Sequence, residues 1–557
     1  MNAIVIGLFL LCVFTLYLGP ITDGDFFWHL KTGEWIWQHR ALPTADPFAD
    51  PRFADAACQL RPEAAQFLLR GYWLAQVILF LIWKWAGPAG IILLRAAIYT
   101  GIVALLLLWS KKRNSLLIAF IMSLLLATLL KEFPGERPQL FTFLLTPITL
   151  YLLEKIRTDA GKSILQPKDR VLPFVMLVWS NLHGGFTMGV ALIAIYMAGE
   201  VIKAVRSKAH LPLRIIMVGL MAILSSLVNP SFHHVFILSI KSFSPATAGI
   251  QEYLSPFTVA ARLGEFYWPY FIFLVGACGI VVWRFRSMEP AHIMALFFLG
   301  GLSVSGLRFM PYFLMTGPIL IGYLPRRELR REWGIILLVT VVWALSFGGG
   351  YFRNTLIEES FPARAVEFIR DNRPAGRMFN YYSWGGYLIH SLPEYPSFID
   401  GRGLNTCADD AYEAALWRDG WKKVFRDNSV HTVLMPGLSL VSGEVYPLIT
   451  NLMADSEWFL VYRDEWSLVF VMNDPRNREL IGRYAMNKEF VFDHVMAAST
   501  RLIKDNPNNP AFWRSRAFAH YHRGELQDAL ADYRMVLKLD PGDRRALEAL
   551  NNIGQMR

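Results

Sequence analysis

The chain has 557 residues, of which 54% are hydrophobic and only 18% are charged, against roughly 25% charged residues in ordinary soluble domains. Its formal net charge of +10 does not indicate a nucleic-acid-binding protein, because most of the excess lies in short loops between apolar segments. The composition therefore excludes an ordinary soluble protein and predicts a polytopic α-helical membrane protein with a smaller polar part.

The apolar segments come first in the chain and are separated by short charged loops, which is the pattern of membrane-spanning helices. We expect about eleven spans. They cover 2–20, 88–109, 115–131, 139–155, 171–182, 186–204, 213–228, 266–284, 291–306, 307–323 and 333–349. The first segment has no basic region before it and no small-residue cleavage site before Asp23, which favours an uncleaved span over a signal peptide. The stretch Trp73–Trp85 has a tryptophan at each end, and we expect an interfacial or re-entrant helix there.

Lysine and arginine are distributed unequally between alternate loops. One set of loops holds Lys111, Lys112, Arg113, Lys155, Arg157, Lys162, Lys168, Arg170, Lys203, Arg206, Lys208, Arg214, Arg284, Arg286, Arg326, Arg327, Arg330 and Arg331. The other set holds only Lys131, Arg137, Lys241, Arg262 and Arg308. Because short basic loops stay in the cytoplasm, we expect a bacterial inner-membrane protein with a cytoplasmic N-terminus and an extracytoplasmic C-terminal part.

This orientation collects unusual polar residues on the outer face, at the ends of the spans. They are Asp23, Asp25, His29, Glu132, Glu136, Arg137, Asn181, His183, Asn229, His233, His234, Glu252 and Arg308. Their concentration on one side predicts a functional site there.

The long first outer loop, 21–72, opens with Asp23-Gly24-Asp25. Two carboxylates one residue apart can share a divalent cation or leave one free as a general base. The alternative is a solvated turn at the end of a helix. The aromatic residues that follow the motif favour a loop that lies along the membrane surface.

Two arginines in this set are candidates for phosphate binding. Arg137 begins a span at its outer end and is either a snorkelling anchor or a phosphate ligand. Arg308 lies between two apolar stretches, where a charge is costly and is usually functional. We expect Arg308 to bind phosphate.

The remaining candidates have less specific interpretations. His29 and His183 are possible metal ligands or substrate contacts, and His183 can also be a purely interfacial residue in the turn Asn181-Leu-His-Gly-Gly185. His233-His234 has the same alternatives. Glu252 is either a ligand or a surface residue.

Around Tyr351 the character of the sequence changes, and charged residues then recur to the end of the chain. We expect a membrane domain at 1–350, an extracytoplasmic α/β domain at 351–480 and a tetratricopeptide-like (TPR-like) helical repeat at 481–557. In the α/β domain, strands are predicted at 432–435 and 468–472, and helices at 363–370 and 411–427.

The repeat follows a 34-residue pattern that starts at Pro510. Its marker residues are Trp513, Ala517, Tyr521, Gly524, Ala529, Tyr533 and Pro541. Because a short array of such units does not stand alone, we expect it to pack on the preceding domain. Cys12, Cys58, Cys278 and Cys407 are widely scattered, which implies neither a thiol metal site nor a disulfide framework.

Taken together, these motifs resemble the GT-C superfamily of membrane glycosyltransferases. The resemblance implies that Asp23 and Asp25 supply the catalytic carboxylate and a ligand for a divalent metal, Mg or Mn. It also implies a sugar donor carried on polyprenyl phosphate. Glu252 is similar in place to an acidic residue in a later outer loop of oligosaccharyltransferases.

A set of bacterial membrane proteins is similar at Asp25-Phe-Phe-Trp-His29, Arg137-Pro-Gln, Asn181-Leu-His-Gly-Gly185, Trp384-Gly-Gly-Tyr387 and Phe398-Ile-Asp-Gly-Arg402. The last two segments resemble the Trp-Trp-Asp-Tyr-Gly region of oligosaccharyltransferase catalytic subunits, although the Trp-Asp pair is absent. The resemblance implies Trp384, Asp400 and Arg402 as acceptor-side residues.

The leading hypothesis is transfer of a sugar or oligosaccharide from a polyprenyl-phosphate-linked donor in the membrane lipid to an extracytoplasmic protein or glycan. Asp25 would act as the base, Asp23 would support it, and Arg137 and Arg308 would hold phosphate. The alternatives are a membrane scaffold that recruits protein partners through the TPR-like repeat, and a transporter.

Overall fold

The computed structural model describes residues 2–48, 69–113, 116–133, 135–159, 165–234, 236, 251–263, 266–321, 332–347, 357, 360–404, 406–440 and 442–555. The loop charges Lys162, Lys241, Arg326, Arg327, Arg330 and Arg331, and also Cys58, lie outside the described residues. The chain forms two compact units, and each is described by itself. The first unit comprises Met1–Asp23, His29–Ala45 and Glu63–Ile357, and the second comprises Gly24–Trp28, Asp46–Pro62 and Glu358–Arg557.

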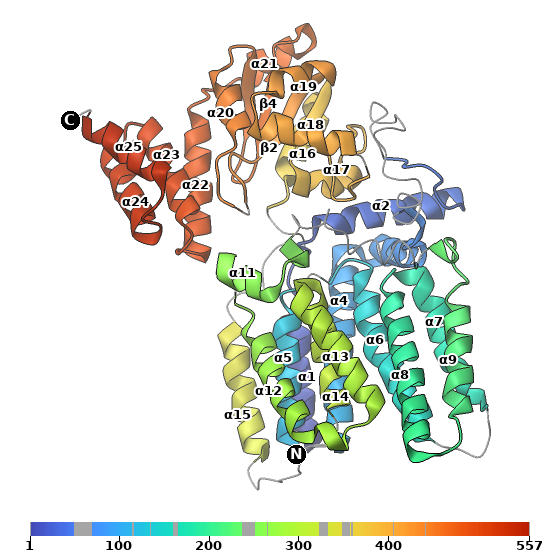
Figure 1. Ribbon diagram of the computed structural model, residues 1–557. Helices are drawn as coiled ribbons and strands as arrows, with labels where there is room; N and C mark the ends of the chain where they lie inside the picture. The colour runs from blue at the N-terminus through green and yellow to red at the C-terminus, as the bar shows by residue number, and fades with distance from the viewer. Residues whose placement is uncertain are drawn as a thin grey trace. The chain divides into compact units, whose positions relative to one another are not determined.

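The first unit is a bundle of apolar helices (Figure 1). Its long helices are α1 (Asn2–Leu16), α4 (Trp73–Arg113), α5 (Leu116–Leu130), α6 (Gln139–Thr158), α7 (Val171–Leu182), α8 (Phe186–Ser207), α9 (Leu213–Ser225), α12 (Trp268–Arg284), α13 (Pro290–Ser305), α14 (Met310–Leu320) and α15 (Glu332–Phe347). Each predicted span overlaps one of these helices, although several helices are shorter than predicted; α1, for example, ends at Leu16 and the predicted span at residue 20. Shorter elements, α11 (Pro256–Leu263), η4 (Gln251–Tyr253) and η6 (Leu307–Phe309), connect them.

Three helical segments of the described chain are long and apolar enough to cross a membrane, namely Trp73–Lys111, Phe186–Ser207 and Trp268–Ser287. Five further apolar helices are shorter than that length. The membrane class follows from these helices, whereas the number of spans and their orientation stay predictions.

Helix α4 is two helices joined at a break. Gly87 has φ 59° and ψ −155° inside it, and Pro88 follows. Glycine tolerates this positive φ, and proline removes a backbone donor and clashes with the preceding turn. The break separates the stretch Trp73–Trp85, which we predicted as an interfacial or re-entrant helix, from the predicted span at 88–109. The two parts run in different directions (Figure 1).

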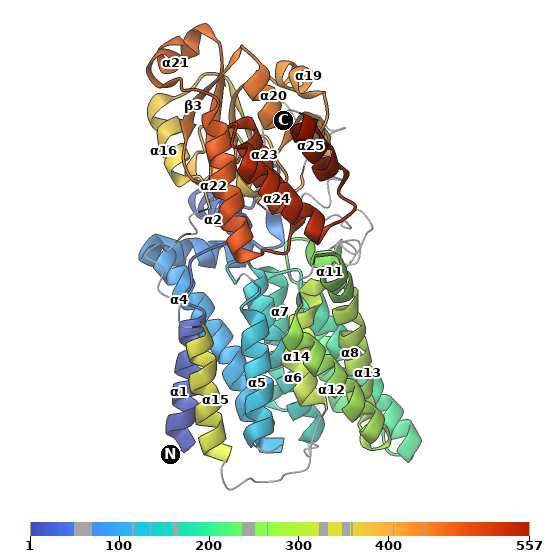
Figure 2. The same ribbon diagram turned by 90° about the vertical axis from the view of Figure 1, so that its left-hand side faces the viewer.

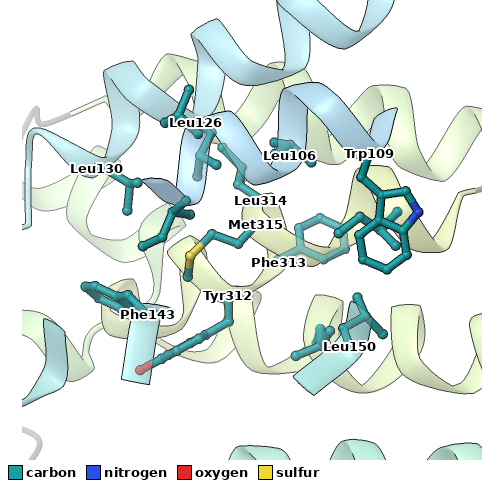
Figure 3. Close-up of a cluster of buried hydrophobic side chains, with 14 of the residues drawn as sticks. Leu106, Trp109, Leu126, Leu130, Phe143, Leu150, Tyr312, Phe313, Leu314 and Met315 are labelled. Atoms are coloured by element: carbon teal, nitrogen blue, oxygen red, sulfur yellow. The ribbon is translucent and has the colours of Figure 1, made fainter. Parts of the chain in front are cut away.

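The core of the first unit surrounds α14, all of whose residues are buried. A helix that is apolar on every side is stable only where neighbours cover all of it. Figure 3 shows its side chains between α4, α5 and α6, and it labels Leu106, Trp109, Leu126, Leu130, Phe143, Leu150, Tyr312, Phe313, Leu314 and Met315. Near the start of α14, Tyr312 contacts Phe143 of α6 with ring centroids 5.4 Å apart, so the first turns of α14 and α6 lie side by side.

The last helix of the bundle, α15, packs against the first, α1 (Figure 2). Phe9 of α1 contacts Phe120 of α5 with ring centroids 4.9 Å apart. The indole of Trp343 donates a hydrogen bond to Thr128 Oγ1 at 3.1 Å. The start and the end of the first unit are therefore joined through α5.

A buried polar network joins α6, α8 and α13. Glu154 accepts hydrogen bonds from Tyr196 Oη at 2.8 Å and from His292 Nε2 at 2.7 Å. Arg157 donates two hydrogen bonds to the same carboxylate, from Nε at 3.0 Å and from Nη2 at 3.1 Å. Because a buried carboxylate is costly without such partners, this network fixes how the three helices meet.

The second unit contains a four-stranded sheet of order β1-β2-β4-β3. Strand β1 (Arg377–Asn380) is parallel to β2 (Val430–Met435), whereas β4 (Leu468–Met472) is antiparallel to both β2 and β3 (Trp458–Arg463). The predicted strand at 468–472 is confirmed, and the one at 432–435 lies within β2. The surrounding helices are α16 (Ala363–Asn372), α17 (Gly385–Ser391), α18 (Thr406–Trp417), α19 (Trp421–Asp427), α20 (Pro447–Ala454) and α21 (Arg478–Tyr484). The predicted helix at 411–427 is thus two helices.

The chain ends in four helices, α22 (Phe490–Asp505), α23 (Pro510–His522), α24 (Leu526–Leu539) and α25 (Arg544–Gln555). Helices α23 and α24 bury Ala517, Ala529 and Tyr533 between them. This helical part is fastened to the sheet part of the same unit, since Ser515 Oγ donates to the carbonyl of Gly443 at 2.5 Å. The assignment of these helices to a TPR-like family stays a prediction.

The cysteine pattern predicted no disulfide framework, but the structure contains a disulfide. Cys407 is disulfide-bonded, whereas Cys12 and Cys278 are free. Sequence spacing could not reveal this, because a disulfide depends on the distance between two residues in space and not along the chain.

Candidate functional site

Four of the predicted site residues form a chain of ion pairs in the first unit. Arg137 Nε lies 2.5 Å from Asp23 Oδ2, and Arg137 Nη2 lies 3.9 Å from Glu252 Oε2. The other carboxylate oxygen of Glu252 lies 3.6 Å from Arg308 Nη1. We call Asp23, Arg137, Glu252 and Arg308 the ion-pair cluster. The structure thus brings together both arginines that the sequence predicted for phosphate.

Each member of the cluster stands at an interruption between helices. Asp23 directly precedes α2 (Gly24–His39), and Arg137 lies just before α6, where Pro138 is the residue at the helix start. Glu252 is in the short helix η4, and Arg308 is in η6. The backbone N–H of Leu307 donates to the carbonyl of Leu254 at 3.0 Å, which holds η4 beside η6.

The cluster is unevenly covered. The side chain of Asp23 is 8% exposed, whereas those of Arg137, Glu252 and Arg308 are 29%, 32% and 23% exposed. The two contacts to Glu252 are longer than hydrogen bonds. Both guanidinium groups are therefore partly exposed, and arginine binds phosphate and carboxylate through paired donors.

Aromatic and histidine side chains line the same part of the unit. The guanidinium carbon of Arg308 lies 4.6 Å from the ring centre of Tyr253. Tyr72 packs between the two predicted histidines, with centroid distances of 5.4 Å to His29 and 5.3 Å to His183. Burial raises the pKa of Tyr72 to about 12, so its hydroxyl stays protonated as a hydrogen-bond donor.

Both histidines are neutral. Burial, and secondarily the charge of Arg137, holds the pKa of His29 well below its usual value. Burial and the charges of Arg308 and Arg137 lower the pKa of His183 to about 3. The amide of Gln76 lies 3.1 Å from His29 Nδ1.

The tautomer of His183 follows from its hydrogen bonds. Its Nδ1 accepts from the backbone N–H of Gly185 at 3.0 Å and lies 2.8 Å from Thr142 Oγ1. The proton of the neutral ring is therefore on Nε2. Thr142 also accepts from the indole of Trp179 at 2.9 Å, so α6 and α7 set the orientation of this imidazole.

The rest of the Asn-Leu-His-Gly-Gly motif has a structural role. Asn181 accepts from the indole of Trp73 at 2.9 Å and donates to the carbonyl of Val228 at 2.8 Å. A side chain at Gly185 would lie 2.7 Å from Thr142, which explains the glycine. His233 and His234 are exposed, and their rings contact each other in a tilted arrangement with centroids 4.2 Å apart.

Asp25 belongs to the second unit. Its carboxylate lies against Gly401, where a Cβ atom would collide with Oδ1. Added Cβ atoms at Gly385 and Gly386 would likewise collide with the backbone of Ile399 and Gly24. The two glycine-containing motifs around 385 and 401 therefore form a cradle around residues 24 and 25.

The predicted acceptor-side residues are largely enclosed. Arg402 has a side chain 2% exposed, lies 2.6 Å from Asp46 Oδ1, and pairs with Asp400 at 2.8 Å through both Nε and Nη2. Burial opposes ionisation of Asp400, but Arg402 holds its pKa below the usual value. Trp384 is 1% exposed, and its indole donates to the carbonyl of Ser360 at 3.0 Å.

The cluster as arranged does not fit a divalent cation. Mg²⁺ needs several oxygen ligands in near-octahedral geometry, whereas Asp23 and Glu252 each face an arginine. Among the described residues, the one group of three converging metal-ligand side chains is His520, Glu525 and Asp528 in the second unit. There His520 Nδ1 pairs with Glu525 at 2.6 Å, which explains the group without a metal.

Sequence reasoning missed Arg95, Tyr72, Gln76 and Thr142. Arg95 is buried in α4 and forms an ion pair with Glu136. Burial raises the pKa of Glu136 to about 6. A lone arginine inside an apolar stretch is a usable signal, because such a charge needs partners. The other three are ordinary polar residues whose roles depend on tertiary contacts.

Comparison with known proteins finds similarity in fold and none in sequence. The sequence matches no family model and no curated protein. The fold is similar to the crystal structure of the Archaeoglobus fulgidus oligosaccharyltransferase tethered through a disulfide bond to an acceptor peptide with an NVT sequon, at a TM-score of 0.51 and 10% sequence identity. The similarity covers 78% of this chain and 68% of that one. At this identity the comparison establishes a similarity of fold alone.

Proposed function

We propose that this chain is a membrane glycosyltransferase that moves a sugar or oligosaccharide from a polyprenyl-phosphate-linked donor to an extracytoplasmic acceptor. The observation that carries the proposal is the pair of partly exposed arginines, Arg137 and Arg308, which meet at Glu252. The GT-C-like fold makes this function more plausible, but the function itself has to be argued from the site.

Arg137 and Arg308 would bind the donor phosphate. When the bond between the sugar carbon and the phosphate oxygen breaks, the electron pair leaves with the polyprenyl phosphate. Two guanidinium groups in a partly buried site stabilise that developing charge, since they are oriented before the reaction begins. Asp23 and Glu252 would keep the two arginines in place until the donor arrives.

Asp25 would remove the proton from the attacking acceptor atom as that atom bonds to the sugar carbon. His183 would offer its Nε2–H as a neutral hydrogen-bond donor to the donor phosphate or sugar. No step is assigned to a metal, since the carboxylates of the ion-pair cluster face arginines.

The compartment is also part of the proposal. Structural disulfides persist in oxidising compartments and are rare in the cytosol, so the disulfide at Cys407 supports an extracytoplasmic second unit. This is the side that the distribution of lysine and arginine predicts.

Binding of the phosphate is the direct test. The purified chain in detergent would be mixed with undecaprenyl phosphate, and bound lipid measured by native mass spectrometry. A hydrogen bond to a charged group contributes about 1.5–3 kcal/mol, so Arg137→Gln and Arg308→Gln should each weaken binding roughly tenfold or more. Arg214→Gln is the matched control, because Arg214 is a partly buried arginine paired with Asp169. Unchanged affinity in the double variant would refute the phosphate role.

A membrane scaffold is the second candidate function. It is favoured by a cavity of about 550 Å³ in the second unit. The cavity lies between the sheet part and the terminal helices and is lined by Trp417, Glu444, Arg514, Arg544 and Arg545. Normal glycans in cells that express an Asp25→Asn, Arg137→Gln, Arg308→Gln variant would place this candidate ahead.

A further inference from the structure

The buried arginine of α4, Arg95, contacts the segment that directly follows α1. Arg95 donates to the carbonyl of Tyr17 from Nε at 3.1 Å and from Nη2 at 2.9 Å, and to that of Pro20 from Nη1 at 3.3 Å. It also donates to the carbonyl of Gly19. These three carbonyls belong to the segment that follows α1, which ends at Leu16. Arg95 is their hydrogen-bond partner and holds the chain that leads to Asp23.

The same guanidinium reaches the other side of the ion-pair cluster. Arg95 Nη1 pairs with Glu136 Oε1, and the side chain of Glu136 is fully buried. Glu136 directly precedes Arg137. The residue before it, Gly135, leaves room for this arrangement, since a Cβ atom there would lie 2.6 Å from Arg95 Cγ.

Arg95 therefore holds both the segment that leads to Asp23 and the segment that contains Arg137. Two residues, Ile21 and Thr22, lie between Pro20 and Asp23, and Arg137 adjoins Glu136. The ion pair between Asp23 and Arg137 at 2.5 Å is the product of two segments that Arg95 holds together. A neutral side chain at 95 would release both segments.

We propose that Arg95 is a positioning residue of the ion-pair cluster: it sets the distance between Asp23 and Arg137 without contacting substrate. This inference rests on the proposed function for its catalytic meaning, whereas the geometry itself can be tested without any substrate. The competing interpretation is that Arg95 merely stabilises the bundle.

A thiol at position 23 reports the distance. In a chain with the two free cysteines replaced, Cys12→Ser and Cys278→Ser, Asp23→Cys would place a thiol beside Arg137. A neighbouring guanidinium lowers a thiol pKa from about 8.5 into the range of about 3.5–7.5. The pKa is measured from the pH dependence of alkylation by iodoacetamide, with mass spectrometry as the readout.

We expect Arg137→Gln to return the thiol pKa towards 8.5 and Arg95→Gln to raise it by a similar amount. Arg95→Lys keeps the charge but not the fork of donors and should give an intermediate value. Arg214→Gln, which removes a partly buried ion pair elsewhere in the unit, should leave the thiol pKa unchanged. A low thiol pKa in a folded Arg95→Gln protein would overturn the proposal.

Folding is checked by the melting temperature of each variant. If Arg95→Gln does not fold, Gly135→Ala serves as the second variant, because its Cβ displaces the Arg95 side chain. The same rise in thiol pKa is expected for it, and an unchanged value would count against the proposal.

Transfer activity is measured separately, in chains that retain Asp23. Arg95→Gln should lower kcat more than it raises KM, since the residue acts through the cluster. If the unmodified chain transfers no sugar while the thiol results hold, the proposed function fails and the positioning role stands. If transfer is established but the thiol pKa does not change in the Arg95→Gln variant, only the positioning role fails.

Discussion

Arg137 contacts Asp23, the first carboxylate of the Asp-Gly-Asp motif, with Nε 2.5 Å from Oδ2. Asp25, the second carboxylate, belongs to the other compact unit and lies against Gly401. The two carboxylates of one short motif therefore have different partners, and substitutions at the two positions should have different consequences.

Asp25→Asn is expected to abolish most of the transfer activity while the protein still folds and inserts. Loss of a general base lowers rates by roughly 10²–10⁴-fold. Asp23→Asn should have a smaller effect, because it removes the partner of Arg137 and leaves the base. The measurement is the glycan content of extracytoplasmic acceptors in cells, with the amount of each variant determined in parallel. Asp505→Asn, at an exposed position of α22, is the control. Full glycosylation by the Asp23→Asn, Asp25→Asn double variant would rule out a catalytic role.

Gly386→Ala should destabilise the second unit, because the new Cβ would collide with the backbone carbonyl of Gly24. Backbone atoms cannot swing aside as a side chain can, and overpacking of this kind costs about 1–3 kcal/mol. The melting temperature of the full chain in detergent is the measurement. Gly482→Ala is the matched control: this helical glycine has open space around it, and alanine there should be neutral or slightly stabilising. Equal melting temperatures for the two variants would contradict the close approach.

Acid should destabilise the second unit through His494. Its Nε2 accepts from the N–H of Gly437 at 3.1 Å, and its Nδ1 lies 3.0 Å from the carbonyl of Asp464. Burial lowers the pKa of His494 from 6.5 to about 4. The unfolded state therefore binds more protons between these values, and stability is lost as the pH falls from 6.5 to 4, by about 3 kcal/mol in total.

The test compares thermal unfolding of the full chain and of His494→Gln between pH 7.5 and 4.5. Glutamine keeps one donor and one acceptor but does not titrate, so the variant should lose less stability on acidification. Parallel curves for the two proteins would mean that His494 is not responsible for the acid sensitivity.

The cysteine at position 407 should be unreactive in cells until a reductant is added. We expect a chain with Cys12→Ser and Cys278→Ser to react with a maleimide–polyethylene glycol reagent only after denaturation and reduction. A gel shift without reduction would mean that Cys407 is not disulfide-bonded, and it would remove one support for an extracytoplasmic second unit. Loss of the disulfide through Cys407→Ser should cost about 2–4 kcal/mol of stability.

The positions of the apolar helices can be read from the sequence. The segment predicted at 115–131 is a helix at Leu116–Leu130, and the segment predicted at 171–182 is a helix at Val171–Leu182. Strand β4 was likewise predicted within its bounds. These features can be read from the chain because burial of apolar side chains is a property of consecutive residues, and it is recorded as an uninterrupted run or a period.

Which polar residues contact each other depends on the tertiary structure. That Arg137 faces Asp23, that Arg95 joins α1 to Glu136, and that Gly386 receives the backbone of Gly24 all depend on contacts between segments far apart in sequence. An ion pair or a close backbone approach leaves no period in the sequence, since each partner is a single residue whose neighbours are unrelated to the contact. The sequence therefore identified the arginines and carboxylates as unusual, and the packing of the helices determined their pairing.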